Sequence, residues 1–233
     1  MLPASVTSTI RGILMDLDGT LYHQRPLRWH MLLELGLSPL TLGPRRAART
    51  LRHLRAFRQV REQLRDLGCP NEPLEDLQYS RTAERLGDEA QAVRETVAEW
   101  MYRRPLRHLP PCRRADLPAF LDAQRERGLQ LGVFSDYPAP DKLEALGVAD
   151  RFSLTLCATD AEINAFKPHP RGFERACELW DLKPEQVLYV GDRDEVDGAG
   201  AQAAGMPVVV LGSESGDYPS AAGLEEVTRA LQG

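Results

Sequence analysis

The chain has 233 residues, of which 42% are hydrophobic and 27% charged, and its formal net charge at pH 7 is -5. A chain of this length buries roughly 70–75% of the surface that its unfolded form exposes, so it needs no disulfides in order to fold. The composition excludes a disordered or fibrous protein, and the acidic balance argues against a general nucleic-acid binder. The apolar runs are too short for a transmembrane helix, and the first ten residues, MLPASVTSTI, lack the pattern of a secretory signal.

The four cysteines form no CxxC pair and no cluster with histidine, so we expect reduced thiols and a cytoplasmic protein. Lysine is rare in this chain: Lys142, Lys167 and Lys183 are the only lysines among 29 basic residues. A lysine that falls in a motif position therefore stands out from the background.

The first predicted element is a buried strand over residues 10–15, which ends abruptly at Asp16. Residues 22–109 show helical periodicity and no convincing strand. Interruptions at 36–44, 68–73 and 87 divide this region into four predicted helices, over 27–35, 45–67, 73–86 and 89–103.

Strands and helices alternate after residue 110, which is typical of βαβ units around a parallel sheet. The strands are predicted over 129–134, 152–157, 187–190 and 207–211, and the helices over 113–127, 140–146, 170–181, 195–204 and 221–231. We therefore predict an α/β fold with a Rossmann-like parallel-sheet core, formed by residues 1–21 and 110–233. Residues 22–109 would form an inserted all-helical cap.

The predicted cap is basic, with sixteen arginines against eleven acidic residues over 22–110. Five of these arginines recur at every third position of one helix: Arg49, Arg52, Arg55, Arg58 and Arg61. They wind around that helix mostly opposite its apolar sector, so we expect them to face solvent. As an alternative, arginines near the first strand, such as Arg25 or Arg28, bind an anionic substrate, and Tyr22 and His23 could face the same cleft.

Polar residues follow the carboxyl ends of several predicted strands, where an open parallel sheet binds its ligands. They are Asp16 and Asp18 after the first strand, Ser135 and Asp136 after the second, Lys167 after the third and Asp192 after the fourth. Crowded carboxylates raise each other's pKa unless a cation neutralises them. A set of oxygen ligands without histidine or cysteine favours a hard cation, and Mg²⁺ fits best.

The same loops offer groups that bind an anion. Gly19 lets backbone amides approach closely, and Thr20 adds a hydroxyl. Lys167 supplies a compact positive charge for a phosphoryl group. Two other interpretations of these motifs fit less well. A serine-hydrolase nucleophile is disfavoured because Ser135 is not part of a GxSxG elbow. A dinucleotide-binding site is disfavoured because the glycines after residue 197 have the spacing GxGxxxxG instead of GxGxxG.

Four segments occur in the order and spacing of the motifs of the haloacid-dehalogenase-like hydrolase superfamily: ILMDLDGTLY, GVFSD, FKPHP and GDRDEVDGAGAQAAGM. The chain resembles that superfamily over its whole length, because residues 22–109 look like a helical cap inserted after the first motif. The resemblance implies that Asp16 is a nucleophile that forms an aspartyl-phosphate. Asp18 would protonate the leaving oxygen and then activate water.

The resemblance also implies how the phosphoryl group and the metal are held. Ser135 and the adjoining amide of Asp136 would bind phosphoryl oxygens, beside the Gly19–Thr20 loop, and Lys167 would orient Asp16 and balance the charge. The implied Mg²⁺ ligands are Asp16, the backbone carbonyl of Asp18, and Asp192, with Asp197 either a ligand or placed directly behind the ligands.

These implications describe a Mg²⁺-dependent phosphatase that acts on a small phosphorylated metabolite, since a closing cap excludes bulky substrates. Asp18 favours phosphoryl transfer over dehalogenation, because cleaving a carbon–halogen bond needs no leaving-group acid. The motifs leave a phosphomutase open, in which a second hydroxyl replaces water as the acceptor. A non-catalytic binding protein that uses the scaffold and its basic cap is the other alternative. We expect neither a nucleic-acid nor a membrane partner.

Overall fold

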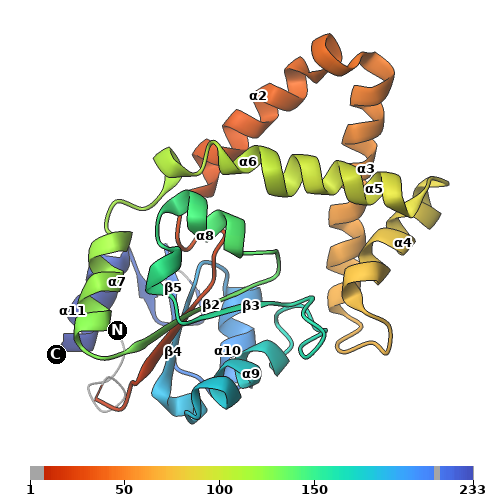
Figure 1. The fold of residues 1–233 in the computed structure, drawn as a ribbon. Helices are drawn as coiled ribbons and strands as arrows, with labels where there is room; N and C mark the ends of the chain where they lie inside the picture. The colour runs from red at the N-terminus through yellow and green to blue at the C-terminus, as the bar shows by residue number, and fades with distance from the viewer. Residues whose placement is uncertain (1–7, 213–215, 233) are drawn as a thin grey trace.

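A six-stranded parallel sheet lies at the centre of the computed structural model, which describes residues 8–212 and 216–232 (Figure 1). The strand order is β3-β2-β1-β4-β5-β6, so β1 is flanked by β2 on one side and β4 on the other. The strands are β1 (Gly12–Met15), β2 (Gln130–Ser135), β3 (Leu154–Cys157), β4 (Val187–Gly191), β5 (Val208–Leu211) and β6 (Ser220–Ala221). This sheet confirms the predicted α/β class.

Helices cover both faces of the sheet (Figure 1). Successive side chains of a strand point to opposite faces, and accordingly Ile13 and Met15 belong to one buried cluster while Leu14 belongs to another. The first cluster includes residues of α7, α8 and α11, and the second includes residues of α9 and α10. These helices are α7 (Leu117–Glu126), α8 (Pro140–Leu146), α9 (Arg171–Trp180), α10 (Ala199–Ala203) and α11 (Leu224–Gln232).

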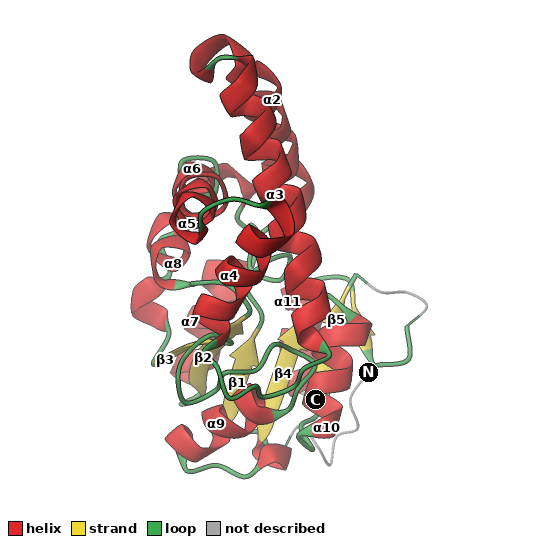
Figure 2. Cartoon of the chain, turned by 90° about the vertical axis from the view of Figure 1, so that its right-hand side faces the viewer, coloured by secondary structure: helices red, strands yellow, loops and turns green. Residues whose placement is uncertain are grey.

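Residues 24–106, which lie between β1 and α7, form a helical segment that we call the cap. Its helices are α2 (Gln24–Leu42), α3 (Pro44–Arg65), α4 (Leu74–Leu86), α5 (Ala90–Val97), η1 (Ala98–Arg103) and α6 (Arg104–Leu106). In Figure 2, α2 and α3 rise above the strand ends. The two connections to the core run side by side, since the amide of His23 donates to the carbonyl of Cys112 at 2.9 Å.

The first cap helix is longer than predicted, because α2 continues through Gly36 and Pro39 to Leu42. Proline lacks the N–H that would bond the carbonyl four residues earlier. Here the hydroxyl of Ser38 donates to that carbonyl, on Leu35, at 2.7 Å. Gly43 then ends the helix with φ of 80°. The predicted helix end at residue 35 was therefore wrong, and within the interruption predicted over 36–44 the helix ends only at Gly43.

The expectation that the arginines of α3 face solvent was wrong for Arg61. The other four of that series are exposed, but Arg61 is only 2% exposed. Its guanidinium donates to the backbone carbonyl of Asp136 at 2.6 Å and lies 3.8 Å from the ring centroid of Tyr137 and 4.4 Å from that of Phe166. These partners come from core loops, so the periodicity of α3 alone did not indicate them.

Smaller differences lie near the C-terminus and at the ends of elements. The two-residue strand β6 was not predicted, because a strand this short has no sequence pattern of its own, and the last helix begins at Leu224 instead of 221. None of the helices among the described residues is both long and apolar enough to span a bilayer. The N-terminal segment judged for a secretory signal lies largely outside the described residues.

Glu34 fastens α2 to the end of the cap, where it accepts hydrogen bonds from Arg104, Arg107 and His108. Burial alone would raise the pKa of Glu34, but the bonds from Arg107 and His108 lower this pKa to about 2. A depressed carboxyl pKa stabilises the fold above the ordinary value near 4.3, and this stabilisation is lost as the pH falls toward the folded value.

We therefore expect Glu34→Gln to lower the free energy of unfolding by about 1 kcal/mol at pH 7. The difference in the free energy of unfolding between the wild type and Glu34→Gln should become smaller as the pH falls below about 4.3. Urea unfolding as a function of pH measures both effects, with the exposed Glu84→Gln as a control. A gap that is independent of pH would contradict this account of Glu34.

Candidate active site

Three motif residues stand at the same edge of the sheet because the strands that carry them are parallel. Met15, the last residue of β1, pairs with Val133 of β2 and Val190 of β4. The next residue, Asp16, donates its amide to the carbonyl of Val190 at 2.8 Å. Ser135 and Asp192 follow the same register on either side of Asp16, as the sequence predicted.

The ammonium of Lys167 bonds to several side chains at this edge of the sheet. It lies 2.6 Å from Oδ1 of Asp16 and 2.7 Å from Oδ1 of Asp197, and it donates to the hydroxyl of Tyr189 at 3.0 Å. The residue is only 2% exposed. Burying an ammonium is costly unless it is paired and hydrogen-bonded, and these three partners meet that need.

Asp197 connects Lys167 to the loop after β4. Its Oδ1 also accepts a bond from Tyr189 at 3.0 Å, while its Oδ2 accepts from the amides of Asp192 and Arg193 at 3.2 Å each. Both of its oxygens are thus engaged. The arrangement favours Asp197 as a residue that holds Lys167 and the Asp192 loop in place.

One carboxylate oxygen from each of Asp16, Asp192 and Asp197 lies within 4.8 Å of the others, and we call these three residues the carboxylate cluster. Burial raises the pKa of Asp16; Lys167 opposes this rise, and Asp197 and Asp192 add to it. Burial and the charge of Asp197 raise the pKa of Asp192 to about 6. The cluster is therefore more negative than Lys167 neutralises, and its all-oxygen donor set fits a hard divalent cation such as Mg²⁺.

The loop after β1 packs tightly against this cluster. Gly19 has φ of 108°, which favours glycine, and a Cβ at this position would lie 1.9 Å from Oδ2 of Asp192, so any other residue would force the Asp192 carboxylate to shift. The hydroxyl of Thr20 is buried and has no hydrogen-bond partner within residues 8–212 and 216–232.

The Asp18 carboxylate is bound by residues outside the carboxylate cluster. The ammonium of Lys142 contacts both of its carboxylate oxygens, at 2.6 and 2.8 Å, and the hydroxyl of Tyr22 donates to Oδ1. The backbone carbonyl of Asp18 accepts a bond from Gln24. Sequence reasoning did not find Lys142, and the scarcity of lysine in the chain was the one signal that pointed to it.

Ser135 and Asp136 lie on the opposite side of Asp16 from Asp192. Ser135 is 1% exposed, and its hydroxyl accepts a bond from the amide of Tyr137 at 3.1 Å. The carboxylate of Asp136 accepts from Arg65 at 2.6 Å and from the amide of Lys167 at 3.2 Å. Burial acts against it, but Arg65 and Lys167 lower the pKa of Asp136. This carboxylate therefore ties α3 of the cap to the Lys167 loop.

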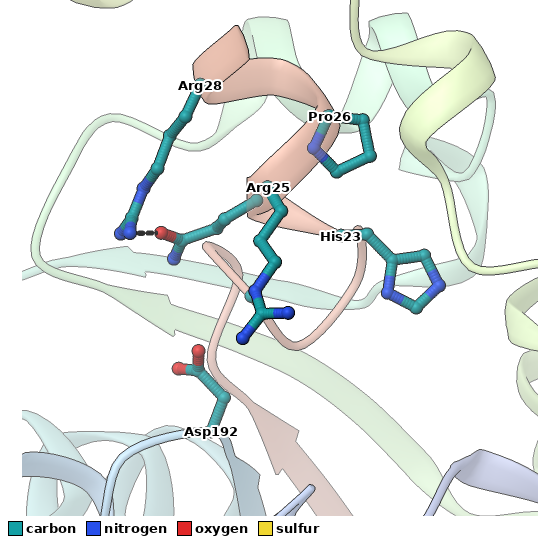
Figure 3. A pocket seen from close by; sticks show the side chains of 7 residues that line it. His23, Arg25, Pro26, Arg28 and Asp192 are labelled. Atoms are coloured by element: carbon teal, nitrogen blue, oxygen red, sulfur yellow. Dashed lines mark hydrogen bonds between the residues drawn. The ribbon is translucent and has the colours of Figure 1, made fainter.

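A pocket of about 620 Å³ opens from the cluster toward the start of α2 (Figure 3). Its lining residues are Gly19, His23, Gln24, Arg25, Pro26, Arg28 and Asp192. Figure 3 shows the guanidinium of Arg25 extending toward Asp192, and Arg28 bonded to Gln24. The sequence suggested Arg25, Arg28, Tyr22 and His23 as an alternative site for an anionic substrate. Of these, Arg25, Arg28 and His23 line a pocket beside the carboxylate cluster, and Tyr22 does not.

Residues 10–205 match the family model described as haloacid dehalogenase-like hydrolase. A phosphoserine phosphatase of Thermus thermophilus is 33% identical over 142 residues, which cover 59% of this chain and 54% of that protein. A phosphoglycolate phosphatase of Escherichia coli is 37% identical over 95 residues, 39% of this chain and 36% of that protein. These alignments thus span about half or less of the curated relatives.

Among solved structures, a 2-haloacid dehalogenase of Pseudomonas syringae superimposes with a TM-score of 0.67 at 21% identity. The superposition covers 96% of this chain and 98% of that one. At this level of identity the likeness concerns the fold alone.

The raised pKa of Asp192 gives a prediction about cation binding. Because the folded, metal-free protein holds this proton more tightly than the unfolded chain, ionisation of Asp192 costs stability as the pH rises from about 4 to 6. Asp192→Asn should therefore raise the Tm of the metal-free protein at pH 7.5 by a few degrees, since about 1 kcal/mol corresponds to roughly 2–4 °C. The increase should shrink at pH 5.

Mg²⁺ should raise the Tm of the wild type at pH 7.5 and should have little effect on Asp192→Asn. Thermal unfolding with EDTA or Mg²⁺ measures both, and the exposed neighbour Glu195→Gln is the control. An equal response to Mg²⁺ in wild type and Asp192→Asn would remove Asp192 from the cation site.

Proposed function

Because this chain belongs to the haloacid dehalogenase-like hydrolases, we propose that it is a Mg²⁺-dependent phosphatase of a small phosphorylated metabolite, acting through an aspartyl-phosphate on Asp16. The observation that carries the proposal is the buried ion pair between Lys167 and Asp16, which is 2.6 Å long. Asp16 follows β1, and Asp192, which follows the neighbouring strand β4, belongs to the same carboxylate cluster. A nucleophile, an ammonium for the phosphoryl oxygens and ligands for a cation thus meet at one edge of the sheet.

Each of these residues has a separate role in the proposed phosphoryl transfer. Mg²⁺, when bound by Asp16, the backbone carbonyl of Asp18 and Asp192, supplies positive charge that favours attack on phosphorus. Lys167 orients the Asp16 carboxylate and stabilises charge on the phosphoryl oxygens. The hydroxyls of Ser135 and Thr20 would donate to those oxygens, and the Thr20 hydroxyl has no other partner among the described residues.

The reaction has two steps. In the first, an Asp16 oxygen bonds to phosphorus, the bond from phosphorus to the substrate oxygen breaks, and Asp18 gives that oxygen its proton. In the second, water bonds to phosphorus and the bond to Asp16 breaks. Asp18 takes the proton of the water, and inorganic phosphate leaves.

We prefer phosphoryl transfer to dehalogenation because the proton transfer proposed for Asp18 would have no role with a halide leaving group. The named curated relatives are both phosphatases, whereas the dehalogenase shares 21% identity and speaks for the fold alone. All four cysteines are free thiols, which supports our proposal of a cytoplasmic location.

We expect purified protein to release p-nitrophenolate and inorganic phosphate from p-nitrophenyl phosphate with Mg²⁺, and to stop when EDTA is added. Asp16→Asn should abolish release. Asp18→Asn should lower turnover of an alkyl phosphate by about 10²–10⁴-fold, which is the usual contribution of a positioned acid and base. The exposed Asp150→Asn serves as the control. Isomerisation of a sugar phosphate without free phosphate would indicate a mutase instead.

The pocket beside the cluster narrows the proposed substrate class. Arg25, Arg28 and His23 line it together with Asp192. A phosphoryl group held at Asp16 and Lys167 would direct the remainder of a short substrate toward these basic side chains. Phosphoserine and phosphoglycolate, the substrates in the names of the two curated relatives, both carry a carboxylate. We therefore propose a small phosphate monoester that also bears a carboxylate.

Two monoesters of equal length test this choice: 2-phosphoglycolate, which bears a carboxylate, and ethyl phosphate, which bears none. Arg25→Gln should lower kcat/KM for 2-phosphoglycolate about tenfold more than for ethyl phosphate, which corresponds to the loss of one charge-assisted bond. Arg58 is an exposed arginine of α3, and Arg58→Gln should leave kcat/KM for both substrates unchanged. Equal losses on both substrates in Arg25→Gln would contradict the proposed subsite.

A further inference from the structure

Lys142 is a buried ammonium that none of the four motifs contains. It lies on α8, which begins five residues after Ser135, and it is 6% exposed. Its Nζ contacts Oδ1 of Asp18 at 2.6 Å and Oδ2 at 2.8 Å, so one ammonium spans the whole carboxylate. The hydroxyl of Tyr22 donates to Oδ1 from another direction. The Asp18 side chain is thereby held in a single orientation.

Packing does not explain why a lysine stands at this position. Leu143 and Leu146 already anchor α8 in the buried cluster, with exposures of 2% and 1%. A buried ion pair adds little net stability compared with apolar side chains of similar size, because both charges lose their hydration. The ammonium therefore calls for an explanation in what Asp18 does.

Tyr22 links the Asp18 carboxylate to the two chain segments that join the core and the cap. It forms an isolated antiparallel bridge with Arg113, which belongs to the returning connection. Burial and the charge of Asp18 raise the pKa of Tyr22, so its hydroxyl stays protonated and donates. Asp18 is thus fixed by Lys142 from the core and by Tyr22 from the start of the cap.

We propose that Lys142, assisted by Tyr22, is a positioning residue that orients Asp18 to take the proton of water during hydrolysis of the aspartyl-phosphate. This inference rests on the proposed function. In that step the water oxygen bonds to phosphorus, the bond between phosphorus and Asp16 breaks, and the water proton passes to Asp18. The products are inorganic phosphate and the free Asp16 carboxylate. The carboxylate of Asp18 must point at the water, and a misplacement of about 1 Å can cost 10²-fold in rate.

The choice of substrate separates this step from the first one. p-Nitrophenolate leaves as a stable anion, so formation of the aspartyl-phosphate from p-nitrophenyl phosphate does not depend on a proton from Asp18. Hydrolysis of the aspartyl-phosphate still depends on Asp18. Loss of Lys142 should therefore slow the second step selectively with this substrate.

We expect Lys142→Met to show a burst of about one p-nitrophenolate per active site, followed by steady turnover that is roughly 10–100-fold slower than in the wild type. The value of kcat/KM, which reports the first step, should change far less than kcat. The phosphorylated protein should accumulate, as intact mass after acid quench would show. Lys142→Arg should recover part of the lost rate, and Tyr22→Phe should give the same pattern more weakly.

Lys183→Met is the matched control, because it removes the charge of an exposed lysine, and its rates should equal those of the wild type. A parallel fall of kcat and kcat/KM in Lys142→Met without phosphorylated protein would overturn the proposal in favour of a packing role. Unchanged turnover would overturn it as well. If Lys142→Met fails to fold, as judged by circular dichroism, Lys142→Arg and Tyr22→Phe decide by the same burst assay.

The wild type distinguishes this inference from the proposed function. If the wild type releases no phosphate with Mg²⁺, the proposed function fails and this inference fails with it. If the wild type turns over normally and the Lys142 variants show no burst, the proposed function stands and the role of Lys142 is refuted.

Discussion

The buried ammonium of Lys167 is the interaction on which the site depends. It neutralises part of a cluster in which Asp16, Asp192 and Asp197 bring their oxygens within 4.8 Å of one another. Without Lys167, the burial of Asp16 and Asp197 would leave two carboxylates unpaired, at a cost of several kcal/mol. With it, the three carboxylates still exceed the single ammonium by two negative charges, and burial together with the charge of Asp197 raises the pKa of Asp192 to about 6. This imbalance makes the edge of the sheet receptive to a cation.

The parallel sheet and the cap contribute differently to this arrangement. Adjacent strands place Asp16 and Asp192 at one edge by register, and Gly19 permits the contact between their loops that a side chain would block. The cap contacts the same edge through Arg65, which bonds to Asp136 at 2.6 Å and to the carbonyl of Lys167. Asp197 of the core and Arg65 of the cap thus both hold the loop that carries Lys167.

The sequence predicted the parallel sheet, the helical segment between its first two strands, and the meeting of Asp16, Lys167 and Asp192, because strand periodicity and strand ends are local features. Lys142 and Arg61 escaped prediction, since their partners lie 124 and 75 residues away in the chain and no periodicity encodes such pairs. The interruption predicted over 36–44 was too wide, because the hydroxyl of Ser38 donates to the Leu35 carbonyl that Pro39 leaves without an N–H partner, and such a side-chain contact has no periodicity in the sequence.

The proposed intermediate is a phosphoryl group bound to the carboxylate of Asp16, and rapid-quench mass spectrometry during turnover tests it most directly. A phosphoryl group should appear on the peptide that contains Asp16, form within the first turnover and disappear as inorganic phosphate is released. A phosphoryl group on a different side chain, or phosphate release at full rate with Asp16 never modified, would contradict the account.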